Sequence, residues 1–179
     1  MLGAPASRYA PPVEGVQTAR ISLGAAEPNV QTGLPVLDHL LGRLAWAGGF
    51  ALALELAPDE PEAEVDEAGA AFGRALVPLL AADGACGFGS GTMPADEALA
   101  TVVLERSKRP LVASNADLSA SRVGGLGIDL AARFLRGLAN AAGLVVHVRL
   151  VEGTDSQHVL EAIFKALGVA LAQACRPRP

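Results

Sequence analysis

Two stretches of the chain repeat the same order of apolar and polar positions. Residues 37–56 and 131–150 each carry apolar side chains at helical spacing, then a glycine, then a short apolar run. The two glycines, Gly49 and Gly143, suit the left-handed residue that follows the end of a helix. Each stretch therefore predicts a helix that ends at a glycine and leads directly into a strand.

Further elements surround both stretches in the same order. The strands are predicted at residues 50–56 and 144–151, and a second helix follows each of them, at residues 61–80 and 156–174. Asp59 and the pair Thr154 and Asp155 can cap the starts of these second helices. Short extended runs precede each block, at residues 16–23, 29–32, 99–105 and 110–114.

The order strand–strand–helix–strand–helix thus occurs twice and predicts a duplicated α+β fold. A sheet that carries its helices on one face can pack through those helices against a second such unit. The two halves are therefore expected to join through their helix layers, with the two sheets on the outside. The seam is expected near Asp83, with residues 1–82 as the first half and 83–179 as the second, in one compact unit. Alanine-rich helices resemble one another by chance, but this repeat also includes the strand between the helices.

Composition and charge narrow the class of protein. The chain has 179 residues, a net charge of -5 and no basic cluster, which excludes a nucleic-acid-binding surface. Residues 1–24 lack a signal-peptide pattern, and no apolar run reaches the length of a membrane span. We therefore expect a cytoplasmic protein without a membrane partner. Its two cysteines, Cys86 and Cys175, are expected to be free thiols.

The chain contains only three histidines: His39, His147 and His158. His158 precedes Glu161 by three residues in a predicted helix, so both side chains share one face and can hold a common ligand. Taken alone, this spacing also fits a capped and solvated helix start.

Five short blocks occur in a fixed order across residues 32–174. They are TGLPVLDHLL from Thr32, FGSGTMPADEALA from Phe88, RPLV from Arg109, ANAAGLVVHVRL from Ala139 and QHVLEAIFKAL from Gln157. In this order they resemble motifs of the imidazoleglycerol-phosphate dehydratase family. Five ordered matches are far more specific than any one of them.

The resemblance implies a fold and an activity. The family has a duplicated α+β unit similar to the second domain of ribosomal protein S5, and it forms a 24-mer with active sites between subunits. It removes water from imidazoleglycerol phosphate to give imidazoleacetol phosphate in histidine biosynthesis. Two manganese ions, held by His and Glu side chains, stabilise the substrate's imidazole ring as an imidazolate and so assist loss of a proton from carbon.

The resemblance implies only some of the family's metal ligands in this sequence. The residues that match ligand positions are His39, Asp66, His147, His158 and Glu161. The residues that stand where the family has further histidines are Glu62, Ala63 and Gln157. We therefore expect at most one occupied manganese site, or none. Its expected ligands are either His39, His158 and Asp66, or His147 and Glu161 with Gln157 or Glu62.

The resemblance also assigns substrate contacts. Glu97 and His39 stand at catalytic positions, and the cations expected to bind the phosphate together are Arg109, Arg122 and Lys165. Any one of these cations is most simply a surface charge, but all three match the family in register. Gln17 is the nearest counterpart of an N-terminal family glutamate, and the family's C-terminal Ser/Lys segment has no counterpart in this sequence.

Three functions remain open at this point. The chain is a carbon–oxygen hydro-lyase that dehydrates imidazoleglycerol phosphate, or a lyase for another substrate that uses one metal ion. The third possibility is a noncatalytic or altered-substrate paralogue that keeps the oligomeric scaffold and a phosphate-binding pocket. The retained phosphate residues favour an enzyme or binder, and the lost ligands favour a paralogue. Expected partners are a small phosphate ester and further copies of the chain, in a 24-mer, or in a trimer if weakened metal ligation stops assembly.

Overall fold

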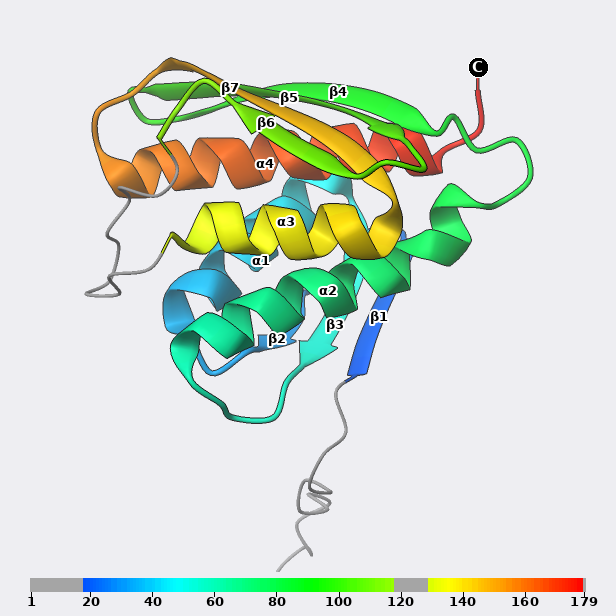
Figure 1. Cartoon of the computed structure of the whole chain (residues 1–179), viewed down its shortest axis with the longest axis horizontal. Helices are drawn as coiled ribbons and strands as arrows, with labels where there is room; N and C mark the ends of the chain where they lie inside the picture. The colour runs from blue at the N-terminus through cyan, green and yellow to red at the C-terminus, as the bar shows by residue number, and fades with distance from the viewer. Residues whose placement is uncertain (1–17, 118–128, 179) are drawn as a thin grey trace, which may run out of the picture.

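Two sheets form the outer layers of the structure, and the helices fill the space between them (Figure 1). This computed structural model describes residues 18–117 and 129–178. In that part of the chain, four helices and seven strands follow one another in the order expected from the repeat, with one additional strand. The α+β fold with its helix layers between two sheets is therefore confirmed.

The first sheet comes from the first half of the chain. It has the strand order β1 (Thr18–Leu23), β3 (Phe50–Glu55), β2 (Asn29–Gln31), with β1 antiparallel and β2 parallel to β3. Its helices are α1 (Pro35–Gly48) and α2 (Pro61–Leu80). Both helices begin with a proline, whose missing N–H has no partner to lose in the first turn.

The second sheet comes from the second half and has four strands. Their order is β4 (Phe88–Ala95), β5 (Ala98–Arg106), β7 (Leu144–Glu152), β6 (Leu111–Ser114). Its helices are α3 (Leu130–Ala142) and α4 (Ser156–Cys175). Gly49 and Gly143 follow α1 and α3 in the left-handed conformation, as expected.

Strand β4 was not expected from the sequence, because glycines hide its alternation. Gly89 and Gly91 face the backbone of α4 so closely that an added Cβ would lie 2.0 Å and 2.4 Å from its carbonyl oxygens. Two of the inward positions of β4 therefore carry no side chain, and the apolar alternation is left to Met93 and Ala95. The second half has three strands before its first helix instead of the two that the repeat predicted.

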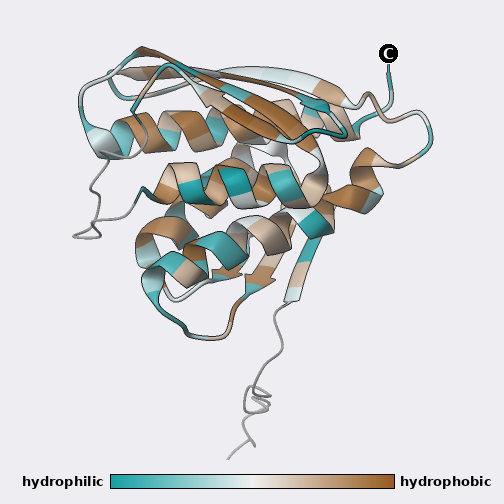
Figure 2. Cartoon of the chain, in the orientation of Figure 1, coloured by the Kyte–Doolittle hydropathy of each residue, from teal (hydrophilic) through white to brown (hydrophobic). Residues whose placement is uncertain are grey.

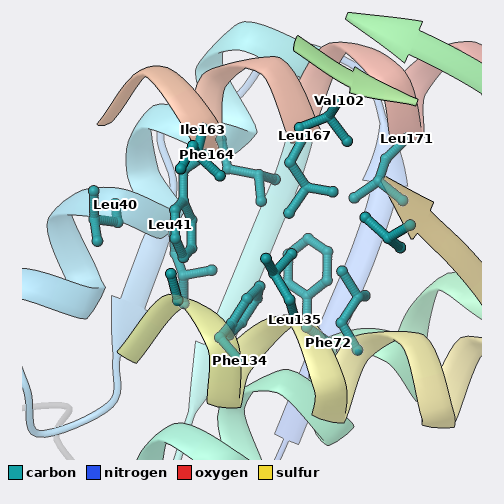
Figure 3. Close-up of a cluster of buried hydrophobic side chains, with 14 of the residues drawn as sticks. Leu40, Leu41, Phe72, Val102, Phe134, Leu135, Ile163, Phe164, Leu167 and Leu171 are labelled. Atoms are coloured by element: carbon teal, nitrogen blue, oxygen red, sulfur yellow. The ribbon is translucent and has the colours of Figure 1, made fainter. Parts of the chain in front are cut away.

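The core lies where three helices meet. The Phe134 ring of α3 lies 5.9 Å from the ring of Phe72 on α2 and 5.2 Å from that of Phe164 on α4, centroid to centroid. Figure 3 shows these rings together with leucines of α1, α3 and α4. The aromatic side chains thus connect helices from both halves of the chain.

Glycines set the spacing of two helix contacts, α1 with α4 and α2 with α3. A Cβ at Gly168 of α4 would lie 2.2 Å from the carbonyl oxygen of Leu44, and a Cβ at Gly73 of α2 would lie 2.8 Å from that of Leu138. In the alignment of residues 37–56 with 131–150, Leu44 and Leu138 are equivalent. The same glycine-to-backbone contact therefore occurs in both copies of the repeat.

Helix α4 combines an apolar composition with burial. It is long and apolar enough to cross a membrane by composition, but 78% of the qualifying stretch is buried inside the protein, as in the core helix of a globular fold. Most of α4 is brown, the colour of hydrophobic residues, in Figure 2. Asp155 caps α4, as expected, by accepting hydrogen bonds from the N–H groups of Gln157 and His158. Asp59 does not cap α2, whose N-cap residue is Glu60.

Candidate functional site

Polar side chains gather where α1 lies against α4, and we call this strip the α1–α4 seam. It consists of His39, Arg43 and Trp46 from α1 and His158, Glu161 and Lys165 from α4. Nε2 of His39 lies 3.4 Å from Oε2 of Glu161, and Nε of Arg43 donates to its Oε1 at 2.8 Å. The helical spacings place each set of three on one helix face.

Glu161 is ionised in this arrangement. Burial raises the pKa of its carboxyl, but the hydrogen bonds from His39 and Arg43 outweigh burial, and the net pKa lies below its ordinary value. Glu161 therefore keeps a negative charge at neutral pH and can hold a cation.

A second pair lies at the start of α4. Nδ1 of His158 is 2.5 Å from Oε2 of Glu97 in the turn between β4 and β5, and Nε2 is 3.3 Å from Oδ2 of Asp96. Oε1 of Glu97 accepts hydrogen bonds from the N–H groups of Asp155 and Thr154. The bond from Asp155, followed by that with His158, lowers the pKa of Glu97 to about 2. The hydrogen bond to Glu97 raises the pKa of His158 above its ordinary value.

We expect the metal-free protein to show a His158 pKa above 6.5, and Glu97→Gln to lower it by removing the main cause. The raised pKa means that the pair stabilises the fold fully below pH 6.5 and that this contribution is lost as the pH rises through the raised value. The lowered pKa of Glu97 means that the contribution is lost as the pH falls from 4.5 toward about 2. NMR titration of the imidazole resonances measures this shift.

Glu105→Gln is the matched control for that titration, because Glu105 is exposed at the far end of β5 from the Glu97 turn. A His158 pKa that Glu97→Gln leaves unchanged would contradict the pairing seen in the structure.

Lys165 lies farther along the same seam, and only 9% of it is exposed. Its Nζ donates to the carbonyl oxygen of Pro94 at 2.6 Å and lies 6.0 Å from the centroid of the Trp46 ring. The Arg43 guanidinium lies 5.3 Å from the same ring. Within the described residues, no carboxylate forms an ion pair with Lys165. A buried cation without a counter-ion is costly, so Lys165 is well placed to meet an anion.

A cleft of about 670 Å³ opens beside α1. One wall presents His39, Arg43 and Trp46, and the other is the loop of residues 25–28 that follows β1. Imidazole, guanidinium and indole groups therefore line one open space together with the carboxylates of Glu27 and Asp38, a polar combination that suits a small ligand.

Asp66 lies away from this seam. Its Oδ2 accepts a hydrogen bond at 2.8 Å from Nη1 of Arg133, which α3 places against α2. Nε of Arg133 lies 3.3 Å from Oδ1 of Asp129, within ion-pair range but without hydrogen-bond geometry. Within one chain, Asp66 therefore does not lie beside His39 and His158. The sequence led us to expect these three residues as one ligand group.

His147 lies on the outer face of the second sheet. Its neighbours Val146 and Val148 are buried against the helices, and alternation along β7 turns His147 outward. His158 and Glu161 belong to α4 on the inner face. The sheet thus separates His147 from the other expected ligands of the same chain.

The expected phosphate cations are also apart. Arg109 precedes β6 at the sheet end where β7 begins, whereas Lys165 lies under the last residues of β4, where β7 ends. The nine residues of β7 span about 30 Å at roughly 3.3 Å per residue, so one chain does not bring Arg109 to Lys165. Arg122 and Gln17 lie outside the described residues.

The α1–α4 seam and the α2–α3 contact differ in the metal-binding side chains that they offer. Within residues 18–117 and 129–178, no three His, Cys, Asp or Glu side chains form a group that could hold one. The α1–α4 seam still fits in donor type, because His39 contacts Glu161 and His158 lies one turn earlier on the same face. The α2–α3 contact does not fit, because a guanidinium holds Asp66.

Three residues of these contacts escaped the sequence analysis. Arg43 follows His39 by one helical turn, and Trp46 by two, so the helical spacing alone places them beside it. Arg133 stands where the repeat alignment has His39. Helical spacing and the repeat alignment were therefore the signals that could have identified these three residues.

Comparisons with known proteins agree with this arrangement. The family model described as "Imidazoleglycerol-phosphate dehydratase" matches residues 32–171. The curated imidazoleglycerol-phosphate dehydratase of Pelobacter propionicus is 36% identical over 160 residues, which cover 87% of this chain and 82% of that protein. The one from Syntrophobacter fumaroxidans is 37% identical over 157 residues, covering 86% of this chain and 80% of that protein.

Solved structures give the same result. The crystal structure of the Staphylococcus aureus imidazoleglycerol-phosphate dehydratase matches with a TM-score of 0.83 at 30% identity, over 92% of this chain and 96% of that one. The Pyrococcus furiosus protein matches with a TM-score of 0.78 at 26% identity, over 93% of both chains. With a family model that spans most of the sequence and relatives above 30% identity, the chain belongs to the imidazoleglycerol-phosphate dehydratase family.

Proposed function

We propose that this protein is a lyase that dehydrates imidazoleglycerol phosphate to imidazoleacetol phosphate, in the cytoplasm, as a step of histidine biosynthesis. The observation that carries the proposal is the α1–α4 seam, which lies within the family match and joins a carboxylate, imidazoles and a buried lysine. Family membership favours this activity over a noncatalytic paralogue.

Different side chains at the seam have different roles in this proposal. Lys165 holds the phosphate of the substrate, because its buried charge has no counter-ion among the described residues. Glu97 is a positioning residue, since it accepts from Nδ1 of His158 and leaves Nε2 turned toward the exposed Asp96. With Nδ1 donating to Glu97, Nε2 of a neutral His158 carries the lone pair that could bind a metal ion, and it lies 3.3 Å from Oδ2 of Asp96.

One manganese ion at this seam is part of the proposal. Glu161, His158 and His39 supply the donors there. When bound, the ion would supply positive charge that assists loss of a proton from carbon. A further donor comes from His147 of a second copy, because the sheet keeps this side chain away from the seam of its own chain.

An assembly larger than a dimer is also part of the proposal, and the placement of His147 and Arg109 supports a site shared between copies. Both are exposed and remote from Lys165 in their own chain, so a shared site needs neighbouring copies. We expect light scattering at micromolar concentration to give a mass well above twice 18.2 kDa. A stable monomer would contradict the shared site.

Glu161→Gln should lower manganese affinity by at least about tenfold, because it removes the charged oxygen donor of the seam. Calorimetric titration of chelator-treated protein with manganese measures the loss. Glu67→Gln is the control, since Glu67 of α2 pairs with Arg74 of the same helix and lies outside the seam. Equal affinities of the two variants would show that the ion does not bind at Glu161.

The activity is tested by incubating the purified full chain with imidazoleglycerol phosphate and detecting imidazoleacetol phosphate. We expect formation of the product that manganese stimulates and a chelator stops, at a lower rate than a family member with its full ligand set. No product with manganese present, while the same substrate still binds, would overturn the proposed dehydratase and favour a binding protein.

A further inference from the structure

The two copies of the repeat place different nitrogen-bearing side chains at equivalent positions. Aligning residues 37–56 with 131–150 puts Arg133 of α3 where α1 has His39. The glycine contacts align the other helix of each pair, with Gly73 of α2 equivalent to Gly168 of α4. This alignment makes Asp66, seven residues before Gly73, the counterpart of Glu161.

The contacts formed at these positions are equivalent too. Nε2 of His39 lies 3.4 Å from Oε2 of Glu161, and Nη1 of Arg133 lies 2.8 Å from Oδ2 of Asp66. The second contact is closer and is part of a larger group, because Asp129 pairs with Arg133 at 3.3 Å as well. Asp129 thereby holds the guanidinium from its own helix while Asp66 holds it from α2.

A guanidinium excludes a metal ion from such a position. It carries a permanent positive charge and five N–H donors, but no lone pair that could bind a metal. It also holds one carboxylate oxygen of Asp66 and one of Asp129 that could otherwise bind a metal ion. Ala63 stands one turn before Asp66, where the equivalent position on α4 holds His158. Imidazole donors are therefore absent from both equivalent positions of the α2–α3 contact.

We propose that Arg133 is a built-in cation that takes the place of a metal ion between α2 and α3. The chain then binds no metal at this contact, and its only metal position within the repeat is the α1–α4 seam. Unlike a bound ion, this charge is not removed by a chelator or released by protonation of its ligands at mildly acidic pH. The inference concerns metal binding and holds whether or not the chain turns over substrate.

Two substitutions test the proposal by copying the α1–α4 donors onto the α2–α3 contact. The double variant Ala63→His/Arg133→His supplies the two imidazoles and frees Asp66, whereas Asp129 keeps its pair with Arg136. The single variant Ala63→His keeps the guanidinium and is its matched control. Equilibrium dialysis of chelator-treated proteins against manganese, followed by elemental analysis, gives the ions bound per chain.

We expect the wild type and Ala63→His to bind the same number of ions, and the double variant to bind one more. An additional ion in Ala63→His alone, or none in a folded double variant, would overturn the proposal. Asp66→Asn in the wild type gives a second measurement that leaves Arg133 in place. We expect it not to change the metal content, and a fall would show that Asp66 is a ligand after all.

Discussion

Replacing Lys165 with methionine should weaken the binding of a phosphate ester by about 10- to 100-fold. Hydrogen bonds to charged groups are worth about 1.5–3 kcal/mol, and each 1.4 kcal/mol is roughly a factor of ten. Lys165 uses one donor on the carbonyl oxygen of Pro94, and the remaining donors of its buried ammonium group need an anion. Methionine keeps most of the aliphatic stem but removes the ammonium group, with its charge and its hydrogen bond to the carbonyl oxygen of Pro94.

Tryptophan fluorescence measures this loss directly, because Trp46 is the only tryptophan of the chain and its ring lies 6.0 Å from Nζ of Lys165. The protein is titrated with substrate or inorganic phosphate, and calorimetry checks the affinity. Lys108→Met is the control, since Lys108 is the only other lysine and is exposed in the turn after β5. A Lys165→Met protein with the affinity of Lys108→Met would remove Lys165 from the phosphate site.

Gly168→Val should destabilise the fold by at least about 3 kcal/mol, at the upper end of overpacking costs. Even a single Cβ at Gly168 would lie 2.2 Å from the carbonyl oxygen of Leu44, and backbone atoms cannot turn aside as a flexible side chain can. Relief therefore requires α1 to move away from α4. For a chain of this size, the loss corresponds to a fall in melting temperature of about 10 °C.

Gly42→Ala is the companion variant, because nothing lies within 4 Å of a Cβ at Gly42 in the middle of α1. Alanine restricts the unfolded chain and favours a helix, so this change should add roughly 0.5–1 kcal/mol of stability. Thermal unfolding of both variants measures the difference. Equal melting temperatures would show that the Gly168 contact does not set the distance between α1 and α4.

The sequence predicted most of the fold because the repeat shows the same helix and strand pattern twice. It missed β4 for a physical reason, since Gly89 and Gly91 pack against the backbone of α4 and leave little apolar alternation. It also offered Asp59 as a cap of α2, whereas the helix, which begins at Pro61 as predicted, has Glu60 as its N-cap. Both errors concern backbone contacts, which a pattern of side chains does not record.

The candidate site was predictable residue by residue but not as a group. The spacing of His158 and Glu161 placed both on one helix face, and the structure agrees. Within one chain, α2 packs on α3 and does not bring Asp66 to α1, so a place for Asp66 in that ligand group would need a second copy. Which helices become neighbours depends on the packing of the whole core, and a local spacing contains no information about it. The site roles assigned to His147, Arg109 and Arg122 stay predictions.

The pairing of the helices has a consequence for the order in which the chain folds during synthesis. Helices α1 and α2 are made first, but they pack on α4 and α3, which belong to the other end of the sequence. The nascent chain therefore leaves the ribosome with the inner faces of its first two helices uncovered. α2 gains its partner when residues 130–142 emerge, and α1 waits for residues 156–175. Native packing of the first two helices thus forms only after both helices of the second half have emerged.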